Sequence, residues 1–179
     1  MNLIIDPNPK DDQYSLNGAL AQYLAGCLGG PTKVIRIYEG EQRYFYYEYN
    51  QEWIDLILES KRLIFPVPMW NFSIPAALKD FLDKTTQRGK LWDFDESRNY
   101  KGLLTDKSAF IIMTSGDNHA DDSGQDFVVP YLKTILSFYG VPDIRYFRLG
   151  GVKNKNLIAD KKFMTESCEQ MLTAFNIRP

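Results

Sequence analysis

Short apolar runs alternate with amphipathic stretches five times along the 179-residue chain, and this order limits the possible fold more than any other feature. The apolar runs are continuous, as expected for strands that are buried on both faces. We predict strands over residues 3–5, 33–38, 63–67, 109–113 and 144–149. Helical spacing predicts helices from Ser15 to the Gly29-Gly30-Pro31 stop and over residues 51–62, 76–82, 127–139 and 156–175. Strands and helices in this alternation predict βαβ units with right-handed crossovers.

The predicted fold is therefore an α/β, flavodoxin-like domain. Its core would be a five-stranded parallel sheet of order 2-1-3-4-5 with helices on both faces. The chain contains no internal repeat, low-complexity tract or linker that would divide it. We expect residues 1–179 to form one domain.

Charge and composition argue against several classes of function. The net charge of -2 gives no reason to expect nucleic acid or a membrane surface as a partner, and no apolar run approaches the length of a membrane span. The N-terminus lacks a leader pattern, which favours a cytoplasmic protein. Cys27 and Cys168 lack metal-site spacing and are expected to be buried, reduced thiols. His119 is the only histidine, so neither a metal site nor a catalytic triad is expected.

Three loops should converge where the strand order reverses, because ligands of open parallel sheets bind there at the carboxyl ends of the strands. They cover residues 6–17, 66–72 and 114–124. The first ends at Ser15, where a helix begins. The free N–H groups of a helix N-terminus suit a phosphate, with Ser15 and Asn17 as further donors. The alternative is that Ser15 only caps the helix, as serine commonly does.

The second and third loops have the composition of a site for a flat ring. Met69, Trp70 and Phe72 could supply apolar surface, and the Asn71 amide could read a polar edge. The alternative is that Trp70 and Phe72 plug the end of the sheet. In the third loop Gly116 permits close approach of a ligand, although an ordinary surface turn explains it equally well.

The stretches PMWNFSIPAALKDFLD, KLWDF, KGLLTDKSAFIIMTSGDNH and FVVPYLKTILSFYGVPDI resemble the FMN-dependent NADH-azoreductase family of flavodoxin-like quinone reductases. The resemblance runs almost continuously from Leu63 to about Gly151. It is looser in the N-terminal third, where YSLNGAL carries it. Two departures stand out: the first loop reads DPNPKDDQ, where relatives carry serines or an arginine, and Asp117 and Asn118 replace two glycines.

The resemblance implies an FMN cofactor, NADH or NADPH as electron donor, a quinone or azo acceptor reduced in a ping-pong reaction, and a homodimer. No catalytic acid or base is required. Carried over by position, the implied cofactor-binding residues are Ser15, Leu16, Asn17, Met69, Trp70, Asn71, Phe72, Ser115, Gly116, Asp117 and Asn118. Pro68 and Thr114 are expected to join them, with Asn8 as a substitute for the polar residues of the family's first loop. The aromatic cluster from Tyr44 to Tyr49 would either contact the acceptor or pack at an interface. Two alternatives remain open: a flavodoxin-like electron carrier, and a family member that has lost FMN and serves as a binding scaffold.

Overall fold

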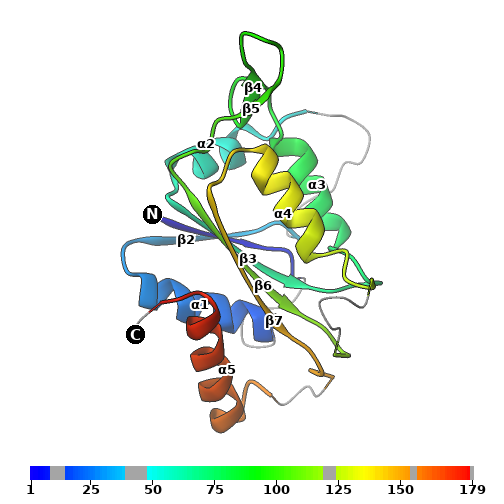
Figure 1. Cartoon of the computed structure of the whole chain (residues 1–179). Helices are drawn as coiled ribbons and strands as arrows, with labels where there is room; N and C mark the ends of the chain where they lie inside the picture. The colour runs from blue at the N-terminus through cyan, green and yellow to red at the C-terminus, as the bar shows by residue number, and fades with distance from the viewer. Residues whose placement is uncertain (9–14, 39–47, 119–123, 154–156, 178–179) are drawn as a thin grey trace.

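The computed structural model describes residues 1–8, 15–38, 48–118, 124–153 and 157–177. Its main sheet has five parallel strands in the order β2-β1-β3-β6-β7 (Figure 1). In that order the strands are β2 (Thr32–Arg36), β1 (Asn2–Asp6), β3 (Arg62–Pro68), β6 (Ser108–Thr114) and β7 (Asp143–Leu149). The predicted flavodoxin-like architecture with a five-stranded parallel sheet is confirmed.

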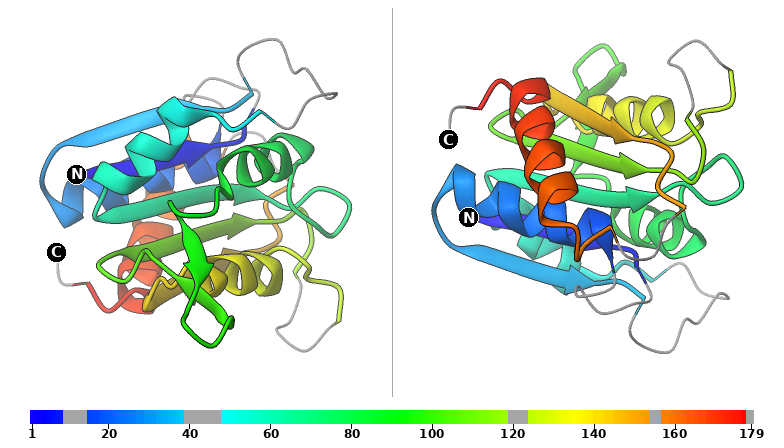
Figure 2. Two further views of the ribbon diagram at one scale, coloured as in Figure 1. Left: turned by 90° about the horizontal axis from the view of Figure 1, so that it is seen from above. Right: turned by 90° about the horizontal axis from the view of Figure 1, so that it is seen from below.

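Helices cover both faces of the sheet (Figure 2). One face carries α1 (Leu16–Leu28) and α5 (Lys161–Ala174). The other face carries α2 (Gln51–Glu59), α3 (Ala76–Thr85) and α4 (Val129–Phe138). None of the helices in the described part of the chain is both long and apolar enough to cross a bilayer.

Alternate residues of each central strand enter two separate hydrophobic cores, which explains the continuous apolar runs. In β1, Leu3 and Ile5 join the core beneath α2, α3 and α4, whereas Ile4 joins the core beneath α1 and α5. Side chains of β3 and β6 divide in the same way. Cys168 is buried in the second core, but Cys27 is only half-buried at its margin, so the expectation of two buried thiols is wrong for Cys27.

Several predicted boundaries shift. The second strand ends at Arg36 and a turn follows at residues 37–38, so the prediction of a strand to Tyr38 is wrong. The helix predicted over residues 51–62 ends at Glu59, because Arg62 already belongs to β3. The last helix begins only at Lys161, behind the cap Asp160, whose side chain accepts from the Phe163 N–H.

A two-stranded antiparallel pair, which the sequence did not predict, projects from the main body (top of Figure 1). It consists of β4 (Trp92–Phe94) and β5 (Tyr100–Gly102), and we call residues 92–102 the arm. Its base is fixed, because the Leu104 N–H donates to the Tyr139 carbonyl at 2.8 Å. A Cβ atom on Gly102 would lie 2.1 Å from the Gly140 nitrogen, so only glycine permits this crossing.

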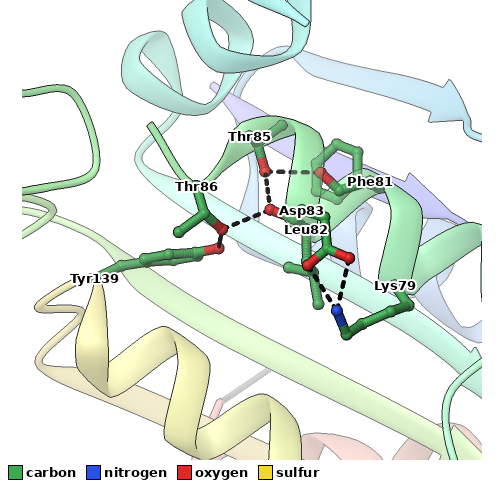
Figure 3. Close-up of polar contacts among 7 residues, drawn as sticks. All are labelled: Lys79, Phe81, Leu82, Asp83, Thr85, Thr86 and Tyr139. Atoms are coloured by element: carbon green, nitrogen blue, oxygen red, sulfur yellow. Dashed lines mark hydrogen bonds and ion pairs between the residues drawn. The ribbon is translucent and has the colours of Figure 1, made fainter. Parts of the chain in front are cut away.

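The C-terminal ends of α3 and α4 are joined by a hydrogen bond between side chains (Figure 3). The Tyr139 hydroxyl and the Thr86 hydroxyl lie 2.5 Å apart, and Thr86 also donates to the Leu82 carbonyl. Burial raises the pKa of the Tyr139 hydroxyl well above its usual range. The Tyr139 side chain is therefore a neutral phenol in the folded state.

Candidate functional site at the carboxyl ends of the strands

The carboxyl ends of β1, β3 and β6 bring the three predicted loops together at one edge of the sheet. The Met69 N–H donates to the Thr114 carbonyl at 2.8 Å, which places the second loop beside the third. The Asn8 amide reaches the Pro66 carbonyl at 3.5 Å, which places the first loop beside the second. Residues far apart in the sequence thus form one continuous surface.

At the end of the first loop, Ser15 caps α1, as one of the two alternatives expected. Its hydroxyl oxygen accepts from the Gly18 N–H at 3.2 Å, and the hydroxyl donates to Oδ1 of Asn17 at 2.9 Å. Leu16 is the first helical residue. Asn17 is 3% exposed, and its Nδ2 atom is buried with no hydrogen-bond acceptor among the residues that the structure describes. A buried amide that lacks a partner costs free energy, so this donor at a helix N-terminus is suited to an acceptor supplied by a ligand.

Asn8 is placed differently from what a phosphate ligand requires. Its backbone N–H donates to Asp6 Oδ1 at 3.0 Å, and its side-chain amide donates to the same carboxylate and to Pro66. Both hydrogens of that amide are therefore engaged within the protein, and only its carbonyl oxygen remains for a further contact. Residues 9–14, which include Lys10, lie outside the described residues.

The second loop is a tight turn with an unusual backbone. The N–H of Trp70 donates to the Ser73 carbonyl at 2.9 Å, and the N–H of Ser73 donates to the Trp70 carbonyl at 3.0 Å. Both central residues are left-handed, with φ of 48° at Asn71 and 69° at Phe72. Asparagine tolerates this region, whereas phenylalanine is strained there.

The rings of this loop do not plug the sheet. Trp70 is 40% exposed and Phe72 is 50% exposed. Trp70 meets Tyr38 edge to face, with ring centroids 6.5 Å apart. The alternative of a buried plug is therefore wrong, and the turn presents aromatic surface at the edge of the sheet. Of the aromatic cluster from Tyr44 to Tyr49, residues 44–47 lie outside the described residues, and Tyr49 is exposed.

A cavity of about 230 Å³ lies between the second and third loops. It is lined by Met69, Asn71, Phe72, Ser115, Gly116 and Asp117, all of which the sequence indicated. Pro68 and Thr114 form the paired strand ends beneath it. Asn118 does not line the cavity. Its side chain lies against the residues that follow β7, where its Oδ1 atom would be 2.6 Å from a Cβ on Gly150.

The third loop is held by contacts that the sequence did not reveal. Ser115 donates from its hydroxyl to the Asp117 carbonyl at 2.6 Å. Lys153 forms an ion pair with Asp117, and its side chain crosses Gly116 at 3.3 Å from where a Cβ would stand. Lys153 follows β7, and the Val152 N–H donates to the Ser115 carbonyl at 3.1 Å, a contact between distant residues that no spacing pattern indicates.

A larger hollow of about 630 Å³ lies beside the arm, lined by Arg88, Phe94, Asp95, Glu96 and Arg98. These residues belong to the arm and its flank, away from the carboxyl ends of the strands (Figure 1). None of the described residues of the three loops lines it. We therefore place the candidate site at the smaller cavity.

In the part of the chain that the structure describes, acid, histidine and thiol groups do not cluster in a way that suits a metal. Among the described residues, no group of three or more histidine, cysteine, aspartate or glutamate side chains could hold a metal ion. His119 lies outside the described residues. The donors at the candidate site are amides, hydroxyls and backbone N–H groups, which suit an organic ligand with an anionic end.

Comparison with protein families gives a match over nearly the whole chain. A family model described as having a flavodoxin-like fold matches residues 2–173. The chain is 34% identical to an FMN-dependent NADH:quinone oxidoreductase of Beijerinckia indica over 108 residues, 59% of this chain and 53% of the relative. It is 41% identical to another from Shewanella amazonensis over 92 residues, 50% of this chain and 46% of the relative. The chain spans about half the length of the curated relatives it matches.

Solved structures of similar fold cover the chain more fully. An azoreductase from Bacillus anthracis superposes with a TM-score of 0.77 at 17% identity, covering 98% of this chain and 99% of that one. An FMN-dependent NADH-azoreductase from the same species, in complex with FMN, gives a TM-score of 0.74 at 20% identity, covering 98% and 97%. These names agree with the resemblance carried by the sequence motifs.

Proposed function

Because the chain belongs to the family of proteins with a flavodoxin-like fold, we propose that it is an FMN-dependent NAD(P)H oxidoreductase that reduces quinones or azo compounds. One observation carries the proposal. The loop edge combines a cavity lined by Met69 and the Phe72 ring with a buried amide at a helix N-terminus that has no acceptor among the described residues. FMN has a flat ring at one end and a phosphate at the other, and this edge offers a partner for each.

The phosphate would be held at the start of α1. The backbone N–H groups of Leu16 and Asn17 stand in the first turn, which leaves them without helical partners. The Asn17 amide would donate to a phosphate oxygen and so gain the acceptor that the described residues do not supply. Ser15 would keep its capping bond and stand beside the anion. Asn8 would not contact the phosphate, because both hydrogens of its amide are engaged by Asp6 and Pro66; it would hold the first loop beside the second.

The ring would be held by the cavity between the second and third loops. Met69 and Phe72 would pack against its faces, and Asn71 with the backbone of residues 115–117 would contact its polar edge. FMN, when bound, would supply the redox chemistry: transfer of hydride equivalents from NADH or NADPH to a quinone or azo acceptor in a ping-pong order. The protein would orient the ring and keep water from it. No side chain of the site needs to act as acid or base.

The proposal extends to the whole molecule. We propose that residues 1–179 act as one domain and that two copies form a homodimer. The exposed rings of Phe94 and Tyr100 on the arm support an interface, because aromatic residues are enriched at such surfaces.

Parallel titrations with FMN and riboflavin test the cofactor. The apo-protein should bind FMN more tightly than riboflavin, because riboflavin lacks the phosphate. The loaded protein should then oxidise NADH rapidly with a quinone. Binding without turnover would favour the electron carrier, and failure to bind either flavin would favour the scaffold that has lost FMN.

A further inference from the structure

The carboxylate of Asp126 lies at a junction of three elements. It is 9% exposed, and its Oδ1 atom accepts from the N–H groups of Val128 at 2.7 Å and Val129 at 3.1 Å, where α4 begins. Its Oδ2 atom accepts from Nε of Arg148 on β7 at 2.8 Å and forms an ion pair with Nη2 of the same guanidinium at 2.8 Å. Both oxygens therefore have partners in the protein.

The ion pair with Arg148 is buried and well oriented. The side chains of Arg148 and Asp126 are 16% and 4% exposed, and the guanidinium carbon lies 4.6 Å from the ring centroid of Tyr146. Removing one partner of such a pair leaves the other charge without compensation. The pair therefore fixes the segment before α4 relative to the sheet.

That segment also supports the strained turn of the second loop. Phe127 follows Asp126, and its N–H donates to the Phe72 carbonyl at 2.9 Å. Phe72 is the left-handed residue that helps to line the cavity. A strained backbone conformation persists only where several independent contacts hold it in place. Here the two bonds between Trp70 and Ser73 close the turn, and the Phe127 N–H holds it from outside.

We propose that Asp126 is a positioning residue for the turn of residues 70–73. It fixes the start of α4 through its two backbone bonds and fixes β7 through Arg148. Phe127 transmits that position to Phe72, and the turn then presents Asn71 and Phe72 to the cavity. As far as it concerns a ligand, this inference rests on the proposed function, because the ligand of the turn would be the flavin ring.

The test compares Asp126→Asn with Asp143→Asn in the full chain. Asp143 also pairs with an arginine of β7, Arg145, but at the amino end of the strand, so its loss is a matched control. Native-state hydrogen exchange of the apo-protein should show faster exchange at the amides of Trp70, Ser73 and Phe127 in Asp126→Asn, by about tenfold or more. Asp143→Asn should leave those three amides at wild-type rates.

Ligand titrations give the second readout. Asp126→Asn should weaken FMN and riboflavin by the same factor, on the order of tenfold, because the ring end is disturbed and the phosphate end is not. The visible circular dichroism of the bound flavin should change as well. Should Asp126→Asn fail to fold, Arg148→Lys replaces it, since lysine keeps the charge but loses the contact through two nitrogens.

Each outcome has one meaning. Unchanged exchange at residues 70–73, in a variant that is folded, overturns the inference. A loss of affinity for FMN but not for riboflavin overturns it too. If the wild-type protein binds no flavin, the proposed function is wrong, and the exchange rates alone decide whether Asp126 positions the turn.

Discussion

At the scale of single residues, Phe72 combines an unfavourable backbone conformation with a half-exposed ring. We expect Phe72→Gly to raise the free energy of unfolding by about 1 kcal/mol, because glycine adopts a positive φ without strain. The same variant should bind FMN more weakly. Chemical denaturation and flavin titration measure the two effects. Tyr23→Gly, at an exposed aromatic without a positive φ, is the control and should only destabilise. A less stable Phe72→Gly would mean that the ring contributes more to folding than its backbone costs.

Ser15 is the residue at which capping and ligand binding can be separated. Ser15→Ala removes the bond from Gly18 and should lower stability by about 1 kcal/mol. It also frees Asn17 Oδ1 from its donor, so the amide beside the phosphate loses its orientation. We therefore expect a loss of FMN affinity with little loss of riboflavin affinity, measured in parallel titrations. Equal affinities for FMN in mutant and wild type would assign Ser15 to capping alone.

At the scale of elements, two glycines of similar appearance in the sequence should respond oppositely to alanine. Gly102→Ala forces β5 away from Gly140 and should destabilise by several kcal/mol or prevent folding, because the clash involves backbone atoms on both sides. Gly26→Ala lies in α1 with open space around the added methyl group and should stabilise by up to about 1 kcal/mol. Thermal melting of both variants compares them. Similar melting temperatures would mean that the arm can shift at its base.

The contact between α3 and α4 should depend on pH. Burial raises the pKa of Tyr139 from its usual 10.0. Its contribution to stability is therefore complete below about pH 10 and is lost as the pH rises above it, because the unfolded chain releases the proton first. Tyr139→Phe should cost about 1 kcal/mol at neutral pH through the lost bond to Thr86. It should also remove part of the alkaline destabilisation, which urea unfolding at neutral and at alkaline pH would measure.

Helices and strands long enough to show a regular pattern of apolar residues could be predicted from the sequence. Contacts between residues far apart in the sequence could not. The three central strands β1, β3 and β6 were recognisable because they bury both faces. The arm escaped prediction because each of its strands has only three residues, too few for a period. At the site, the loops could be chosen from strand order. The ion pair of Asp126 and Arg148 could not be predicted, because the two residues are 22 positions apart and only the folded chain brings them into contact.

At the scale of the whole molecule, the arm supports the proposed dimer. Tyr100 is 69% exposed and stacks on Phe94. The two rings therefore form an exposed apolar surface on the arm. We expect the wild-type protein to be dimeric by light scattering at micromolar concentration and Tyr100→Ser to dissociate more readily. Tyr23→Ser, which removes an exposed ring from α1 on the other face, is the control. A wild-type monomer that binds FMN and turns over would contradict the proposed assembly.

The position of β1 between β2 and β3 has a consequence for synthesis on the ribosome. β1 emerges first, and β2 can pair with it on one side, but its other neighbour begins only at Arg62. Because the ribosome adds about 5–20 residues per second, the edge of β1 that will pair with β3 has no hydrogen-bonded neighbour for some seconds. During that time Leu3, Ile4 and Ile5 lack a partner on that edge, although all are fully buried in the end. The nascent chain should therefore attract chaperones early, and variants that slow translation before residue 62 should aggregate more than those that slow it later.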